Sequence, residues 1–100
     1  MTEFLVELTT TVPEGTEPSE VERRRAAEAV RAAELASAGH LVRLWRAEGE
    51  LPSIGLWRAA DISELCEKAI STLPLRPWMT VKITTLESHP NDPGRTSHED

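Results

Sequence analysis

The sequence is poor in cysteine and in aromatic residues. It holds one cysteine, Cys66, and four aromatic residues, three of which are tryptophan. A single cysteine excludes both an intrachain disulfide framework and a zinc site built from cysteines. The three histidines, His40, His89 and His98, do not have the spacing of metal ligands. We therefore expect no metal site.

The chain also lacks an excess of positive charge and any long apolar segment. It has 11 lysine and arginine residues against 17 aspartate and glutamate residues, a formal net charge of -6. Binding to nucleic-acid phosphates needs a basic face, so we expect no nucleic-acid partner. No apolar run approaches the roughly 18 residues of a membrane span, and no signal-peptide pattern opens the chain. These absences predict a cytoplasmic protein without membrane association.

The length of 100 residues predicts a single domain over residues 1–90 and a polar tail over residues 91–100. A chain this short buries only roughly 60–70% of the surface that its unfolded form exposes, so its core is small. From Glu87 onward the sequence is too polar to order itself alone. We expect the tail to stay loose or to pack on a neighbouring subunit of a homo-oligomer.

Hydrophobic periodicity predicts four strands and two helices. In chain order, the expected elements are a strand over 3–10, a helix over 19–38, strands over 40–47 and 53–59, a helix over 62–73 and a strand from 79 onward. This order predicts an α+β, ferredoxin-like βαββαβ fold, in which an antiparallel four-stranded sheet carries both helices on one face. Since the other face would be bare in a monomer, we expect two such faces to meet in a dimeric α+β barrel.

Both predicted helices begin with a capping-box pattern. Ser19 and Glu22 predict the start of the first helix, and Asp61 and Glu64 predict the start of the second. Ile62 belongs to the apolar face that we expect on the second helix.

The first predicted helix carries one charged pair in an unusual position. At about 100° per residue, small apolar residues form a broad arc that we expect to face the sheet. The members of this arc are Val21, Ala26, Ala29, Val30, Ala32, Ala33 and Ala36. The charges expected on the solvent side are Arg23, Arg24, Arg31 and Glu34. Arg25 and Glu28 break this division, because they lie in a stripe within the apolar arc.

Two interpretations of this pair are open. A glutamate that faces a core is costly unless it is paired or hydrogen-bonded, and Arg25 could form a structural salt bridge with Glu28. Alternatively, Glu28 is a partly desolvated carboxylate, whose pKa burial would raise and Arg25 would lower. Such a group can take a proton from carbon and return it.

The segment from Leu73 to Met79, here called the connector (residues 73–79), joins the second helix to the last strand and is stiff. Pro74 and Pro77 each fix φ and remove a backbone donor. Each also biases the residue before it toward extended geometry. We expect the connector to hold Arg76 and Trp78 in place, where they could line a pocket.

Several short motifs along the chain belong together. In chain order, they are Phe4-x-Val6, Arg25-x-x-Glu28, Gly39 followed five residues later by Leu44-Trp45-Arg46, Gly49, Leu73-Pro74-Leu75-x-Pro77-Trp78-Met79 and His89-Pro90. This combination resembles the muconolactone Δ-isomerase family over roughly residues 3–93. The resemblance implies a ferredoxin-like subunit, a dimeric unit, assembly into a ring-like decamer and a reaction without any cofactor.

The resemblance also implies the chemistry. The family moves a double bond in a five-membered lactone with an acetate side chain, converting muconolactone to 3-oxoadipate enol-lactone in the β-ketoadipate route of aromatic catabolism. This reaction needs a carboxylate of raised pKa, a cation for the substrate carboxylate and donors for a developing oxyanion. Glu28 is the expected base. Arg25, which stands where the family typically has lysine, is the second catalytic candidate.

The candidate substrate-binding residues are Arg43, Trp45, Arg46, Trp57, Arg76 and Trp78. In a regular strand, Arg43 and Arg46 lie on opposite faces, and Trp45 shares the face of Arg43. Each tryptophan could instead be a core or interface residue.

The sequence departs from the family pattern at two places. Better-known members carry histidine at the position of Arg43, and tyrosine and asparagine in the region of Leu51 to Ile54. The substrate could therefore be a related lactone or enone. A non-catalytic ligand-binding or scaffold protein of the same fold is the alternative function. A third interpretation is a dimeric-barrel monooxygenase or haem-degrading relative, but the histidine or asparagine arrangement usual in that class is not evident here.

Overall fold

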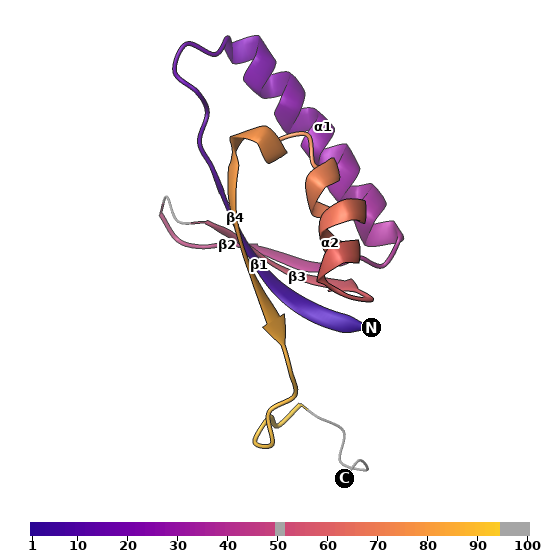
Figure 1. Cartoon of the computed structure of the whole chain (residues 1–100). Coiled ribbons are helices and arrows are strands. Elements are labelled where there is room, and N and C mark those ends of the chain that lie inside the picture. The colour runs from indigo at the N-terminus through magenta and orange to yellow at the C-terminus, as the bar shows by residue number, and fades with distance from the viewer. Residues whose placement is uncertain (50–51, 95–100) are drawn as a thin grey trace.

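The computed structural model describes residues 1–49 and 52–94 of the chain and shows the predicted order of elements (Figure 1). The elements are β1 (Thr2–Thr10), α1 (Pro18–Ser37), β2 (Leu41–Arg46), β3 (Ser53–Ala59), α2 (Ile62–Lys68), the short 3₁₀ helices η1 (Ile70–Thr72) and η2 (Arg76–Trp78), and β4 (Met79–Leu86). The bounds of β1, β2 and β3 agree with the prediction to within one residue.

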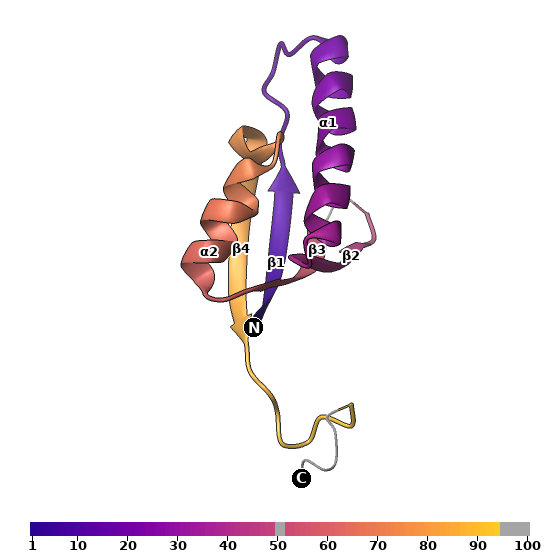
Figure 2. The ribbon, with the colours of Figure 1, turned by 90° about the vertical axis from the view of Figure 1, so that its right-hand side faces the viewer.

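The four strands form one antiparallel sheet in the order β2-β3-β1-β4. Phe4 of β1 lies opposite Trp57 of β3, and Val6 lies opposite Gly55. Both α1 and α2 cover the same face of this sheet (Figures 1 and 2). The predicted α+β, ferredoxin-like arrangement is confirmed.

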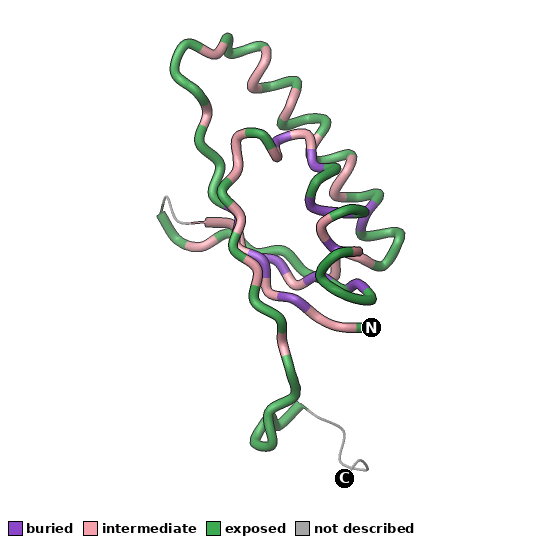
Figure 3. The backbone as a smooth tube through the Cα atoms, in the orientation of Figure 1, coloured by how far each residue is buried: buried purple, intermediate pink, exposed green. Residues whose placement is uncertain are grey.

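The core lies between the sheet and the helices, where α2 and the C-terminal end of α1 cover β1 and β3 (Figure 3). It consists of Phe4, Val6, Leu8, Leu35, Trp57, Ala59, Leu65, Ala69, Ile70 and Leu73. Gly55 permits the closest packing within it, because a Cβ atom there would lie 2.5 Å from Nε1 of Trp57. The Trp57 ring therefore lies over a position that only glycine can occupy without a shift.

Asp61 caps the second helix as predicted, but Glu64 bonds to the N–H of Ala60 instead of that of Asp61, so the capping box is formed only in part. The helix after it is also shorter than predicted. The Glu64 N–H donates to Oδ1 of Asp61 at 2.8 Å, and the Glu64 carboxylate accepts from the Ala60 N–H at 2.5 Å. The helix ends at Lys68 instead of reaching residue 73. The chain tightens into η1 because Leu73, the residue before Pro74, has to be extended. Leu65 is the one buried residue of this short helix. Ile62, its first residue, is 48% exposed, contrary to our expectation.

The start of α1 differs from the prediction. The helix begins at Pro18 with Glu17 as its N-cap, and the Glu17 side chain makes no capping hydrogen bond. The predicted box of Ser19 and Glu22 is therefore wrong. Proline starts the helix here because its φ is already helical and its missing N–H would have no partner in the first turn.

The predicted apolar arc of α1 is only partly correct. Leu35 is buried, and Val21, Arg24, Glu28 and Ala32 are half-buried along the stripe that leads to it. The exposed members of the predicted arc are Ala26, Ala29, Val30, Ala33 and Ala36. The difference arises because the N-terminal half of α1 contacts the connector through long polar side chains, which alanine cannot replace.

The second face of the sheet is not covered by any described helix. It presents Leu5, Ile54 and Leu56, which are half-buried, beside Trp45, which is 43% exposed. After β4, the described part of the predicted tail leaves the sheet and is exposed as far as Gly94 (Figure 1). The rest of that tail, with His98, lies outside the described residues, as does Leu51.

Candidate functional site

Glu28 lies on the side of α1 that faces the connector, and it is half-buried. Its Oε1 atom accepts a hydrogen bond of 3.0 Å from the backbone N–H of Leu75. Burial raises the pKa of Glu28 above its ordinary value, and the hydrogen bond from Leu75 offsets part of that rise. This carboxylate is thus easier to protonate than a free glutamate, which suits a group that carries a proton between two carbon atoms.

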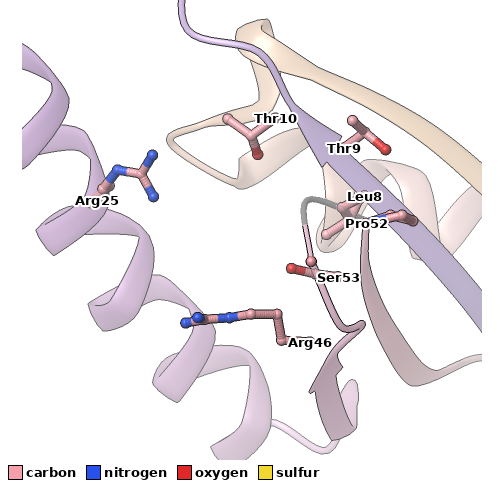
Figure 4. Close-up of a pocket in the computed structure, with 8 residues that line it drawn as sticks. Leu8, Thr9, Thr10, Arg25, Arg46, Pro52 and Ser53 are labelled. Atoms are coloured by element: carbon pink, nitrogen blue, oxygen red, sulfur yellow. The ribbon is translucent and has the colours of Figure 1, made fainter.

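The possible salt bridge between Arg25 and Glu28 is not formed. The carboxylate of Glu28 is held by the connector, and Arg25 makes no ion pair with any described residue. Its guanidinium extends instead into a pocket between α1 and the strands (Figure 4). If Glu28 has a purely structural role, that role is therefore its hydrogen bond to Leu75 and not a salt bridge with Arg25.

We call this space the arginine pocket. It is lined by Leu8, Thr9, Thr10, Arg25, Arg46, Gly49, Pro52 and Ser53, and its volume is about 480 Å³. Arg25 enters from α1 and Arg46 from the end of β2, so two guanidinium groups extend into it (Figure 4). None of these eight lining residues is acidic. Two cations and three hydroxyl groups give the arginine pocket the chemistry that suits an anion such as a carboxylate.

The two arginines of β2 lie on opposite faces of the sheet. Arg46 pairs with Ser53 on the helix-covered face, whereas Arg43 pairs with Leu56 on the other face. The Arg43 guanidinium lies over the Trp45 ring, with its Cζ atom 5.0 Å from the ring centroid. Arg43 and Trp45 are therefore separated by the sheet from the arginine pocket.

The other candidate side chains take different positions. Trp57 is 2% exposed and belongs to the core, and its Nε1–H is buried without a hydrogen-bond partner among the described residues. Arg76 folds back on the connector, where its Nη1 donates to the carbonyl oxygen of Met79 at 3.1 Å. Trp78 lies half-buried beneath Arg24. Of the six candidate binding residues, Arg46 alone lines the arginine pocket among the residues that the structure describes.

Arg24 is a residue that the sequence analysis missed. Its Nη1 donates to the carbonyl oxygen of Pro74 at 3.0 Å, and its Nε donates to Oε2 of Glu20 at 2.8 Å. Its Cζ atom lies 4.7 Å from the centroid of the Trp78 ring. The prediction that Arg24 faces solvent is therefore wrong. The available signal was its spacing of four residues from Glu28, which places both side chains on one face of a helix.

Ser53 and the threonines of the arginine pocket were also missed. Leu8 lies opposite Ser53 where β1 and β3 pair, and Thr9 and Thr10 complete β1 beyond that point. Polar residues that end one strand and begin its neighbour were the signal for a polar site at that edge.

The described residues contain neither a cluster of metal-binding side chains nor a helix that could span a membrane. Over residues 1–49 and 52–94, no three His, Cys, Asp or Glu side chains gather closely enough to hold a metal ion. In the same ranges, no helix is both long and apolar enough to span a membrane.

Comparison with known proteins gives consistent results. The sequence profile of the family described as muconolactone delta-isomerase matches residues 2–92. A muconolactone Delta-isomerase from Pseudomonas aeruginosa is 31% identical over 88 residues, which cover 88% of this chain and 91% of that protein. The fold is similar to a crystal structure of muconolactone isomerase, with a TM-score of 0.83, 24% identity, and coverage of 94% of this chain and 97% of that one. The chain belongs to the muconolactone Δ-isomerase family.

Proposed function

We propose that the protein is a cofactor-free isomerase that converts muconolactone to 3-oxoadipate enol-lactone in the cytoplasmic catabolism of aromatic compounds. One observation carries the proposal. A half-buried carboxylate of raised pKa, Glu28, lies one helical turn from Arg25 of a pocket with two arginines. Family membership and the name of the Pseudomonas aeruginosa relative support the same activity.

The arginine pocket supplies the binding step. The acetate arm of the lactone is a carboxylate, and the guanidinium groups of Arg25 and Arg46 are the matching cations. Glu28 does not line the arginine pocket itself but lies about one helical turn along α1 from Arg25. The proposal therefore requires the lactone ring to extend from the bound acetate arm toward the connector, where the Glu28 carboxylate lies. Ser53 and Thr10 add hydroxyl donors at the same edge of the sheet.

Glu28 supplies the proton transfer. The ionised carboxylate takes the proton from the ring carbon that bears the acetate arm, and the electron pair of the broken C–H bond moves into a dienolate. The negative charge that develops on the lactone carbonyl oxygen is stabilised by donors in the pocket. The protonated Glu28 then returns the proton to the carbon next to the carbonyl. The double bond has moved, and the base is regenerated.

The test is turnover of muconolactone by purified protein, followed by absorbance and by proton NMR in D₂O. We expect Glu28→Gln to lower kcat by about 10³-fold, because general base catalysis contributes roughly 10²–10⁴-fold. Glu22→Gln is the matched control, since Glu22 is an exposed glutamate on the same helix. Because Glu28 returns the proton that it has taken, solvent deuterium should enter the product at the carbon next to the carbonyl only as far as the protonated carboxyl exchanges with D₂O before the return.

Two results would contradict the proposal. Wild-type turnover in Glu28→Gln, with the fold intact by circular dichroism, would remove Glu28 as the base. Absence of turnover on muconolactone and on other butenolides, with calorimetric binding of the carboxylated lactone, would instead favour the ligand-binding alternative. For the monooxygenase alternative, oxygen uptake with an electron-rich phenol is the discriminating measurement.

We also propose that the protein acts as a homo-oligomer whose minimal unit is a dimer formed through the uncovered sheet face. Apolar side chains gather there, with Leu5 and Leu56 directly opposite each other and Trp45 opposite Ile54. A second copy of the same face would cover them, as in a sheet-on-sheet packing. Light scattering should report a dimer or larger assembly, and Trp45→Glu should shift the mass toward the monomer. A monomeric wild type would refute this arrangement.

A further inference from the structure

We infer that Arg24 is a positioning residue for Glu28, because the two side chains hold opposite ends of one peptide group, the one between Pro74 and Leu75. Arg24 donates to the Pro74 carbonyl oxygen at 3.0 Å, and Glu28 accepts from the Leu75 N–H at 3.0 Å. In a trans peptide these two groups point in opposite directions. Arg24 and Glu28 are one helical turn apart on α1, and the peptide group bridges them.

This peptide group is available because the connector does not use it internally. The Arg76 N–H donates to the Leu73 carbonyl, and the Trp78 N–H donates to the Leu75 carbonyl. The nitrogen of Pro74 carries no hydrogen. The Pro74 carbonyl and the Leu75 N–H are thus left out of the two turns of the connector, and both bond to α1.

The connector is itself fixed in place. Leu73 and Leu75 are 3% and 6% exposed, so the segment is anchored in the protein interior on both sides of Pro74. Pro74 and Pro77 limit its backbone freedom. The Leu75 N–H therefore has a defined position, and the Oε1 atom of Glu28 is held to it.

Arg24 is held by three groups at once. Glu20 accepts from its Nε atom, Pro74 accepts from its Nη1 atom, and the Trp78 ring lies under its guanidinium plane at 4.7 Å. These contacts need a planar, forked cation. A lysine ammonium is a point charge and cannot reproduce them together.

The consequence concerns the geometry of the base. Oε1 of Glu28 is bound to Leu75, and Oε2 has no hydrogen-bond partner among the described residues. Oε2 is therefore the oxygen presented for proton transfer, in an orientation set by the Oε1 bond. Arg24 need not touch the substrate. It acts by keeping the connector against α1, and this inference rests on the proposed role of Glu28 as base.

The experiment compares Arg24→Met and Arg24→Lys with Arg23→Met. Arg23 is the matched control, because its exposed side chain pairs with the same Glu20. We expect both Arg24 variants to lower kcat about tenfold or more, with KM changed less than about twofold, because a small misplacement of a reacting group is costly. Arg23→Met should match the wild type. Wild-type kcat in Arg24→Lys would overturn the forked geometry, since charge alone would then suffice.

A second measurement does not depend on turnover. In the wild type, the Leu75 amide proton shift should follow the titration of Glu28, because a hydrogen bond to the charged carboxylate is stronger. In Arg24→Met this dependence should be largely lost, and exchange of the Leu75 amide with solvent should accelerate. An unchanged Leu75 signal would overturn the inference even if Glu28→Gln were inactive. Full turnover in Glu28→Gln would instead refute the proposed base. In that case, loss of the pH dependence of the Leu75 shift in Arg24→Met would still establish the link between Arg24 and Glu28.

Discussion

Two neighbouring arginines on α1 have opposite surroundings. Arg24 is bonded to Glu20 and Pro74 and lies over Trp78, whereas Arg25 has no ion-pair partner among the described residues and extends into the arginine pocket. The helical turn directs one side chain to the connector and the next to the strands. An arginine whose hydrogen bonds are all made within the protein, such as Arg24, is suited to hold other groups in place. An arginine without such partners, such as Arg25, is available to bind a ligand.

This difference has an energetic consequence for the arginine pocket. Arg25 and Arg46 are like charges in one space of about 480 Å³, and no acidic residue stands among the eight that line it. Their mutual repulsion is reduced when an anion binds between them. If the substrate carboxylate binds in this pocket as proposed, both arginines should contribute to its affinity.

The largest expected effect in this comparison is the loss of both pocket cations. Each hydrogen bond to a charged group contributes about 1.5–3 kcal/mol, so each single Arg→Met change should raise KM about tenfold or more. Arg25→Met combined with Arg46→Met should raise KM for muconolactone by about 100-fold. Steady-state kinetics will measure it. The Arg24 variants should show the reverse pattern, with kcat reduced and KM retained.

Salt provides an independent check on the same comparison. Because ions screen exposed charges, raising sodium chloride should increase the wild-type KM and have less effect on the double variant. A wild-type KM in the double variant would show that the substrate carboxylate binds elsewhere. Arg43 on the opposite sheet face would then be the next residue to change.

The sequence was sufficient for the architecture but not for the contacts of α1. Alternating apolar residues in β1 and β3 predicted those strands to within one residue, because burial of one sheet face dictates period-two patterning. The helix was harder, since an arc of alanines looks apolar on a helical wheel whether or not anything packs on it. Val30 belongs to that arc and is 60% exposed, so no described segment covers this part of it.

The same limit of a helical wheel explains why Glu28 was predicted as a site residue and Arg24 was not. Glu28 could be singled out because a carboxylate in an apolar stripe is anomalous on any helical wheel. For Arg24, the spacing of four residues from Glu28 showed only a shared helix face. Its contacts with Pro74 and Trp78 could not be predicted, because they lie about fifty residues later in a connector whose position depends on the whole fold. Side-chain spacing reports which residues share a face, and only the tertiary structure reports what that face meets.

The smallest expected effect concerns the stability of the folded protein. It distinguishes the cost of burying the Glu28 charge from the gain of its hydrogen bond to Leu75. The pKa of Glu28 is raised above the ordinary value of 4.5 because burial disfavours the charged form. The folded protein therefore holds this proton more tightly than the unfolded chain. The associated stability is fully present below pH 4.5 and is lost as pH rises through the folded-state pKa. At neutral pH the ionised Glu28 thus lowers stability relative to a neutral group of the same shape.

Glu28→Gln tests this sign, because the glutamine oxygen can still accept from the Leu75 N–H. We expect the variant to be more stable than the wild type at pH 7 by at most about 1 kcal/mol, since the group is only half-buried and solvent screens its charge. The difference should disappear at pH 4, and urea unfolding at the two pH values will measure it. A variant less stable at pH 7 would mean that the Leu75 bond to the ionised carboxylate outweighs desolvation. A variant that is more stable yet inactive would show that the protein keeps a destabilising charge at this position for its chemistry.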